Sequence, residues 1–429
     1  MKTAIREIST EKLQKVSGNP GVKVLDVRPV DAYNGWTMRN EPRGGHIKGA
    51  KSIPAKWADY LDWIEIVRSK GISPDQYIII YGYTMEEAEW VARLFRRAGY
   101  ADIRIYPYFL KEWSPNPELP MEHLEKYEHL VYPEWLHTLI SGESPPNYHG
   151  KSCVLCHVHY RNEADYAAGH IPGAIALDTR VLESPATWNR RNPEELTQAL
   201  QNHGITHDTT VIVYGRFSFP KNEDPFPGSS AGHLGAIRCA AIMLYAGVED
   251  VRVLNGGVQS WEDAGYGLST DETTPSPVDE FGAEIPGRPE LMVDLPEARS
   301  LLDSNEGELV SVRSWREFLG EVSGYNYIEK KGRIPGAVFA NCGSDAYHME
   351  NYRNLDHTTR EYHEIADLWR EAEILPEKHI AFYCGTGWRG SEAFYNAWLM
   401  GWPRISVYDG GWFEWSSDPE SPTETGIPE

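Results

Sequence analysis

Residues 379–400 decide the fold, and they read HIAFYCGTGWRGSEAFYNAWLM. Positions 380–383 form a short apolar run typical of a buried strand, and positions 391–400 place apolar residues at helical spacing. A glycine-rich turn therefore joins a strand to a helix. Because such a turn directs backbone N–H groups and the positive end of the helix dipole toward one point, it is a binding site for an anion.

The anion expected in this turn is a sulfur atom. Cys384 opens the turn and Arg389 closes it, so the loop amides, the helix dipole and the guanidinium should all favour a thiolate. A buried core cysteine is the alternative, but it suits Cys239 better, since Cys239 begins an apolar run. Four residues separate Cys384 from Arg389, one fewer than in phosphatases with a cysteine nucleophile. The smaller loop predicts a bound sulfur, a persulfide.

At these residues the chain resembles the rhodanese family of sulfurtransferases, and in particular its three-domain type. Besides the loop, the resemblance rests on Arg313-Ser314-Trp315, GYNYI at 324–328, Gly343-Ser344-Asp345, His348-Met349-Glu350 and Tyr408-Asp409-Gly410-Gly411-Trp412. It implies that Cys384 and Arg389 are catalytic. The substrate-binding residues that we expect are Gly385, Thr386, Gly387, Trp388, Arg313, Ser344, Asp345 and His348. Turn or capping roles are an alternative for Ser344 and Asp345.

A threefold internal repeat extends this organisation to the whole chain. Each repeat has a strand pattern, a Gly-x-Ile-x-Gly-Ala turn and a closing tryptophan: VLDVR at 24–28, 45–50 and Trp113; VLCHV at 154–158, 169–174 and Trp261; LVSVR at 309–313, 332–337 and Trp415. The pattern predicts an α/β fold of three tandem rhodanese-like domains, each an open, mostly parallel sheet with helices on both faces. We expect the domains at 1–120, 126–272 and 285–429, with Cys384 at the carboxyl end of a strand.

The first two repeats have no nucleophile in the loop. Gly82 and Gly215 stand where Cys384 stands in the third repeat, so we expect both domains to be catalytically silent. Residues 217–233, rich in Pro, Gly and Phe, are interpreted as a long inserted loop of the second domain. It is expected either to cover the active site or dock a partner, or to be a solvated surface loop.

The other cysteines form neither a disulfide scaffold nor a cofactor site. Five cysteines in 429 residues are too few and too dispersed for such a scaffold. Cys153, Cys156 and His157 match the attachment signature of c-type haem, but residues three apart on a strand point to opposite faces. Cys342 is either a second thiol or a structural cysteine. We expect no cofactor and no metal.

Composition limits the partners. The formal net charge of −22 argues against nucleic acid and anionic membranes. No apolar run approaches the roughly 20 residues of a membrane span, and the first residues lack the apolar core of a signal peptide. We expect a monomer or weak association. The compartment is predicted to be the periplasm if an export leader has been removed, and the cytoplasm otherwise.

The resemblance implies a sulfurtransferase. It would move sulfane sulfur from a small anionic donor, such as thiosulfate or 3-mercaptopyruvate, through a Cys384 persulfide to a thiol, cyanide or protein acceptor, with Arg313 and Arg389 neutralising the donor. Gly385 and Thr386 follow Cys384 where thiosulfate rhodaneses carry basic residues, which leaves the donor open. The alternatives are a sulfur-relay adaptor and an enzyme that handles selenite or another chalcogen. A cysteine-dependent phosphatase or arsenate reductase is disfavoured by the loop length.

Overall fold

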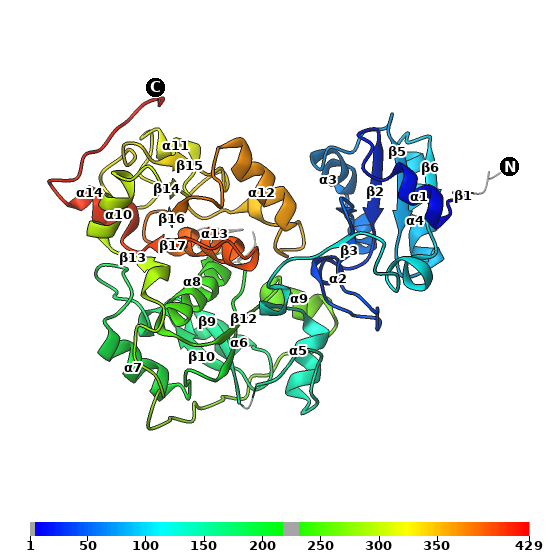
Figure 1. The fold of residues 1–429 in the computed structure, drawn as a ribbon. Coiled ribbons are helices and arrows are strands. Elements are labelled where there is room, and N and C mark those ends of the chain that lie inside the picture. The colour runs from blue at the N-terminus through cyan, green and yellow to red at the C-terminus, as the bar shows by residue number, and fades with distance from the viewer. Residues whose placement is uncertain (1–4, 151, 218–230, 429) are drawn as a thin grey trace. The chain divides into compact units, whose positions relative to one another are not determined.

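The computed structural model describes residues 5–150, 152–217 and 231–428, and Figure 1 shows them as a ribbon. Three five-stranded sheets follow one another along the chain, in the orders β1-β6-β5-β2-β4, β10-β9-β11-β12-β8 and β13-β17-β16-β14-β15. Read from the first strand of each domain, the three orders are the same. All pairings within them are parallel. The predicted α/β fold with parallel sheets and surrounding helices is confirmed.

The elements of the first domain are the strands β1 (Arg6–Glu7), β2 (Val22–Asp26), β4 (Lys51–Ser52), β5 (Tyr77–Tyr81) and β6 (Ile103–Ile105), the helices α1 (Thr10–Val16), α2 (Val30–Asn34), α3 (Trp63–Ser69) and α4 (Met85–Arg97), and an antiparallel pair, β3 (His46–Ile47) with β7 (Met121–Glu122). Those of the second are β8 (Leu130–Val131), β9 (Cys153–His159), β10 (Ile175–Asp178), β11 (Thr210–Tyr214), β12 (Asp250–Leu254), α5 (Pro133–Ile140), α6 (Glu163–Ala168), α7 (Pro193–Asn202), α8 (Ala231–Ala246) and α9 (Gly257–Asp263).

The third domain contains β13 (Met292–Val293), β14 (Gly307–Ser311), β15 (Val338–Phe339), β16 (His379–Tyr383), β17 (Ile405–Tyr408), α10 (Leu295–Leu302), α11 (Trp315–Phe318), α12 (Tyr362–Glu371), α13 (Trp388–Leu399) and α14 (Gly411–Ser417). The middle strands β5, β11 and β16 are apolar and almost wholly buried, because helices cover both faces of a parallel sheet. Each middle strand leads into the loop that the repeat aligns with Cys384.

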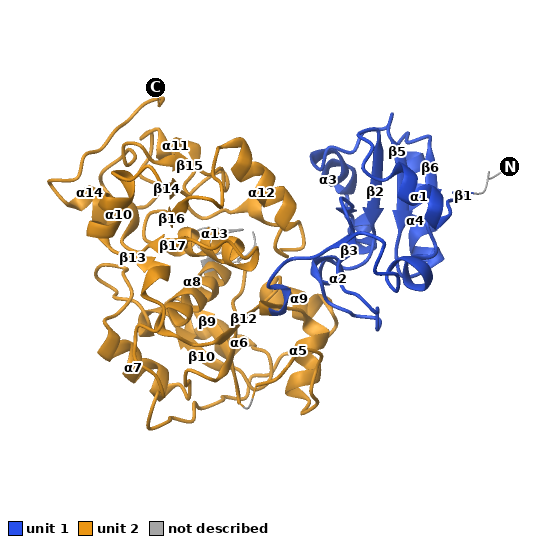
Figure 2. Ribbon diagram, viewed as in Figure 1, with its two compact units in different colours: residues 1–128 blue, residues 129–429 orange. Residues whose placement is uncertain are grey.

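The chain divides into two compact units, residues 1–128 and 129–429 (Figure 2). The second and third domains together form the larger unit, within which helix α8 packs against helix α13 (Figure 1). Apart from His233 and Arg238, the buried residues of helix α8 are apolar or small, since the helix is buried between two domains. Most of the predicted inserted loop at 217–233 lies outside the described residues, and α8 already begins at Ala231. In the described residues, no helix is long and apolar enough to cross a membrane.

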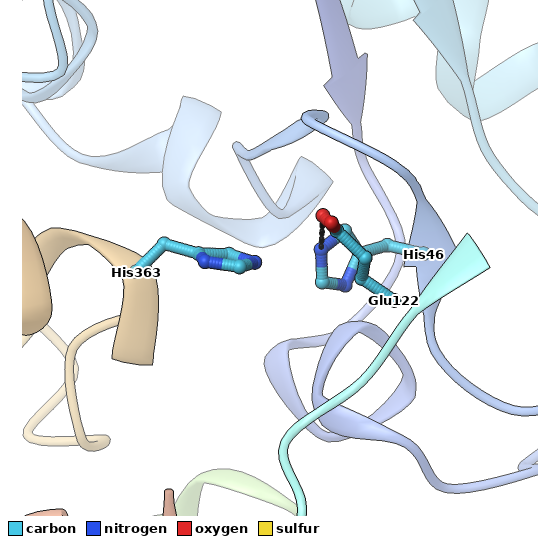
Figure 3. A group of neighbouring side chains, drawn as sticks. All are labelled: His46, Glu122 and His363. Atoms are coloured by element: carbon cyan, nitrogen blue, oxygen red, sulfur yellow. Dashed lines mark ion pairs between the residues drawn. The ribbon is translucent and has the colours of Figure 1, made fainter. Parts of the chain in front are cut away.

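The Gly-His-Ile turns of the first two repeats are fixed by the same contact. The ring of His46 stacks on Tyr33 at 3.6 Å, and that of His170 stacks on Tyr166 at 3.8 Å. In the first unit, His46 also faces Glu122 across the β3–β7 pair, with 4.0 Å between Nε2 and a carboxylate oxygen (Figure 3). These histidines therefore have a packing role.

Candidate active site around Cys384

Cys384 directly follows β16 and is fully buried. The helix after it, α13, begins at Trp388, three residues earlier than the apolar pattern indicates. The reason is Gly387, which caps the helix in the left-handed conformation (φ 88°) that a glycine adopts without strain. The loop is thereby shortened, and Arg389 lies in the first helical turn rather than in the turn before it.

The loop presents its amides rather than its carbonyls to a ligand. The carbonyl oxygens of Cys384 and Gly385 accept hydrogen bonds from the backbone N–H groups of Trp412 (2.8 Å) and Phe413 (2.9 Å). By contrast, the backbone N–H groups of residues 385–390 donate to no acceptor within the described part of the chain. Together with the amino end of α13, these amides can hold a negatively charged sulfur attached to Cys384.

Behind the loop lies a buried cluster of two arginines and one glutamate. Both terminal nitrogens of Arg389 donate to the carboxylate of Glu317, at 3.0 and 2.8 Å, and Nε of Arg313 donates to it at 3.3 Å. Burial alone would raise the pKa of Glu317, but the attraction of Arg389 and Arg313 outweighs burial and lowers it to about 2. One carboxylate between two guanidinium groups leaves a net charge of +1 at the centre of the domain.

Arg389 also fastens the loop to the preceding segment of the third domain. It donates to the backbone carbonyl of Asp345 (3.2 Å) and to the hydroxyl of Tyr325 (3.0 Å). The predicted binding of a donor anion by Arg313 and Arg389 stays a prediction. The structure adds that both side chains are fully buried and already hydrogen-bonded within the protein.

The loop meets a group of tyrosines. The ring of Tyr325 lies so close to Gly385 that a Cβ at this position would be 2.2 Å from a ring carbon. Tyr325 stacks on Tyr327 (ring centroids 5.2 Å apart) and contacts Tyr347 edge-on (5.8 Å). Burial raises the pKa of Tyr327, and a side-chain hydrogen bond with Thr386 of the loop opposes this rise. Gly385 is therefore required for the close approach of Tyr325.

The second domain extends this aromatic surface. Trp188 stacks on Tyr327 at 5.1 Å, and Tyr160 contacts Trp388 edge-on at 5.6 Å. Trp188 and Trp388 also face each other at 6.4 Å, with ring planes 78° apart. We call these four side chains, Tyr160, Trp188, Tyr327 and Trp388, the aromatic rim. All four are partly accessible to solvent.

The remaining predicted residues lie in one turn. Asp345 accepts hydrogen bonds from the Tyr347 amide (2.8 Å) and pairs with Nδ1 of His348 (2.7 Å). The amide of Ser344 donates to the side chain of Glu350 (2.9 Å). Only Asp345 contacts Arg389 directly, through its carbonyl. These hydrogen bonds are those of a turn, the alternative role considered for Ser344 and Asp345. Substrate binding by Ser344, Asp345 and His348 stays a prediction.

The first two domains have no room for a side chain at the loop position. A Cβ on Gly82 would lie 2.7 Å from the side chain of Val27, and one on Gly215 would lie 2.1 Å from the carbonyl oxygen of Gly232. That both domains are catalytically silent stays a prediction.

The other thiols are poorly placed for catalysis. Cys153 is exposed at the start of β9 whereas Cys156 is buried within the strand, and the two are not joined by a disulfide. Burial raises the pKa of Cys156 and Cys239. Burial also raises the pKa of Cys342 to about 12, against the opposing effect of Arg389. A structural role fits Cys342 better than that of a second thiolate.

The sequence analysis missed Glu317 and Tyr325 beside the loop, as well as Tyr160, Trp188 and Tyr327 of the aromatic rim. Glu317 had a signal, the capping box that it forms with Ser314 at the start of α11, but that box does not reveal Arg389 as its partner. Tyr325 belongs to the GYNYI stretch, which carried the resemblance without an assigned role.

Three parallel repeats, with a single cysteine in an amide-lined loop, define a sulfurtransferase of the rhodanese type, and the chain belongs to the rhodanese family. The rhodanese-like domain matches residues 9–116, 149–264 and 294–418. Thiosulfate sulfurtransferase YnjE of Escherichia coli (strain K12) is 40% identical over 427 residues, which cover 98% of this chain and 92% of that protein. The sulfur carrier protein TtuD of Thermus thermophilus is 31% identical over 263 residues, 59% of this chain and 84% of its own.

Solved structures are more similar still. The anaerobic ergothioneine biosynthesis enzyme from Chlorobium limicola, in complex with its natural substrate trimethyl histidine, is 60% identical with a TM-score of 0.97, covering 99% of this chain and 100% of that chain. A structure of EanB with ergothioneine covalently linked with a persulfide cysteine has the same identity, TM-score and coverage.

Proposed function

We propose that this sulfurtransferase moves a sulfur atom from a Cys384 persulfide to the imidazole ring of a trimethylated histidine, and so forms ergothioneine. The observation that carries the proposal is the position of the aromatic rim beside the amide-lined loop of Cys384. The likeness to solved structures that hold trimethyl histidine or ergothioneine supports the same acceptor.

The first step loads the sulfur. The Cys384 thiolate attacks the sulfane sulfur of a donor, a new S–S bond forms, and the bond between that sulfur and the rest of the donor breaks. The leaving group keeps the electron pair of the broken bond. The free amides of residues 385–390 stabilise the persulfide anion, as donors of an oxyanion hole do. Thiosulfate is one candidate donor, in view of the name of the Escherichia coli relative.

The second step transfers the sulfur from Cys384 to the acceptor. The outer persulfide sulfur forms a bond to the imidazole carbon between the two ring nitrogens, the S–S bond breaks, and Cys384 leaves as a thiolate. The hydrogen of that carbon is lost as a proton and one proton is returned to the product. Because a sulfane sulfur is already at the oxidation level that a C–H bond needs to become C–SH, the step requires no oxidant. Two tyrosines border the loop at this point: Tyr327, which is hydrogen-bonded to Thr386, and Tyr325, whose hydroxyl accepts a hydrogen bond from Arg389 and donates one to the carbonyl oxygen of Ala346.

The aromatic rim suits the other end of the acceptor. A trimethylammonium group cannot donate hydrogen bonds and is bound in proteins by the faces of tryptophan and tyrosine rings. Trp188 and Trp388 contact each other edge to face, and both are partly accessible to solvent, so the accessible parts of their rings offer surfaces of this kind. A thiol or cyanide acceptor would make no use of these rings.

A competition between acceptors tests this function. Protein whose Cys384 carries a persulfide is mixed with equal amounts of trimethyl histidine and histidine, and in parallel with cyanide or dithiothreitol, and the products are separated by liquid chromatography. We expect ergothioneine as the main product and preference for trimethyl histidine over histidine of at least about tenfold, from the loss of a cation–π contact. Transfer to cyanide or thiol without any ergothioneine would instead assign the chain to general thiosulfate sulfurtransferases.

A further inference from the structure

The side chain of Trp388 is held by a residue of the second domain. Its indole nitrogen donates to both carboxylate oxygens of Glu183, at 3.1 and 3.0 Å. Glu183 follows the short turn after β10 and is 1% exposed. Trp388 is the first residue of α13 and directly follows Gly387 of the loop. A carboxylate of a catalytically silent domain therefore contacts the end of the loop that carries Cys384.

Glu183 is itself anchored by Arg238 of helix α8. Nε of Arg238 donates to Glu183 at 3.2 Å, and the same guanidinium donates to Asp409 of the third domain and to the carbonyl oxygen of Trp188 at 3.1 Å. Arg238 and Asp409 are fully buried. One buried ion pair thus connects both tryptophans of the aromatic rim.

The Cys384 loop packs tightly against Arg238 and Asp409. A Cβ on Gly387 would lie 2.9 Å from the carbonyl oxygen of Asp409 and 3.1 Å from a terminal nitrogen of Arg238. On the neighbouring turn of α8, a Cβ on Gly235 would lie 3.5 Å from the Trp388 ring. Since backbone and indole are both in contact with α8, a change in the indole's position must move the loop or leave a void.

We propose that Glu183 is a positioning residue of the active site. Through the indole of Trp388 it sets the rim and the amino end of α13, so the second domain, which has no nucleophile, completes the site of the third. The inference rests on sulfur transfer from Cys384, but not on the identity of the acceptor. Burial raises the pKa of Glu183 to about 7 against the attraction of Arg238.

A double-mutant cycle tests the coupling. Glu183→Leu, Trp388→Phe and the double variant are compared with the parent in kcat/KM for trimethyl histidine and for cyanide. Each single variant should lose about tenfold, the cost of one hydrogen bond to a charged group. The double variant should lose no more than the worse single one. Glu183→Gln, which keeps an oxygen acceptor for the indole, should restore most of the activity.

A control distinguishes a positioning role of Glu183 from a general contribution to the contact between the second and third domains. Asp294→Asn weakens another ion pair between the two domains, with Arg190, and should leave kcat/KM unchanged. Losses that multiply in the double variant, or Trp388→Phe with parental kcat/KM, would overturn the proposal. The Trp388→Phe result is decisive even if Glu183→Leu does not fold, because this variant leaves Glu183 in place and replaces only the indole ring by a phenyl ring. If the parent protein transfers sulfur to cyanide but makes no ergothioneine, the proposed function is refuted but the positioning role is not. The double-mutant cycle is then evaluated from kcat/KM for cyanide.

Discussion

Replacing Glu317 by glutamine should destabilise the third domain in a pH-dependent way. The variant leaves Arg313 and Arg389 buried beside a neutral amide, and Glu317 accepts from Arg389 at 2.8 Å. A carboxyl pKa that falls from 4.5 to about 2 corresponds to a stabilisation of about 3 kcal/mol at neutral pH. Breaking a buried ion pair by removing one partner costs about 3–5 kcal/mol, which is the same range.

The sign of the pH dependence follows from the lowered pKa. Between pH 4.5 and about 2 the unfolded chain binds a proton at Glu317 that the folded chain does not. The stabilisation is therefore complete above pH 4.5 and is lost as the pH falls toward 2. The difference between parent and Glu317→Gln should shrink by about 1 kcal/mol between pH 7 and pH 4.

Urea unfolding followed by tryptophan fluorescence at pH 7 and pH 4 measures this difference. Glu321→Gln is the matched control, because Glu321 pairs with Arg316 at the surface, and its effect should stay within about 0.5 kcal/mol. A loss below about 1 kcal/mol at pH 7 for Glu317→Gln, or the same loss at both pH values, would show that the two arginines do not depend on this carboxylate.

Three further substitutions test separate parts of the site. Gly385→Ala should lower kcat/KM at least about tenfold by pushing away the ring of Tyr325, whereas Gly267→Ala, which meets no atom within 4 Å, should not; equal kcat/KM for the two variants would remove the packing argument. Arg389→Lys should impair transfer and lower the melting temperature, since an ammonium cannot replace a fork that binds Glu317 with two nitrogens; a fully active variant would contradict this. Cys153→Ser should turn over like the parent, and a loss of turnover with an unchanged melting curve would show that the Cys153 thiol takes part in the reaction.

The sequence predicts those parts of the fold that depend on short, local patterns of residues. Apolar runs at the three middle strands, the repeated Gly-x-Ile-x-Gly-Ala turn and the cysteine between a strand and a helix all act over a few residues. Gly82 and Gly215 could be aligned with Cys384 for the same reason. In the structure, a side chain at either glycine would collide with neighbouring atoms, so the packing itself favours glycine at these two positions.

The partners of the charged residues could not be predicted, because they come from distant parts of the chain. Arg389 and Glu317 are 72 residues apart, and Trp388 and Glu183 are 205 residues apart. Each pair depends on how two layers or two domains pack, which no short pattern records. The structure explains the Glu317 carboxylate as the counter-ion of two buried arginines.

The acceptor was out of reach for a related reason. The rim is assembled from Tyr160 and Trp188 of one domain and Tyr327 and Trp388 of the next. Only Trp388, which lies next to the loop, was expected at the site; Tyr160, Trp188 and Tyr327 were given no role. The expected acceptors, a thiol or cyanide, followed from the family resemblance alone.

A single-turnover experiment tests the central claim most directly. The protein is treated with a sulfane-sulfur donor, freed of excess donor and mixed with one equivalent of trimethyl histidine, and the intact protein and its Cys384 peptide are followed by mass spectrometry. We predict that the Cys384 peptide first gains the mass of one sulfur atom and then loses it as ergothioneine appears in equal amount, and that Cys384→Ser does neither. Ergothioneine formed without a sulfur on Cys384, or a persulfide on Cys384 that trimethyl histidine does not discharge, would contradict the account.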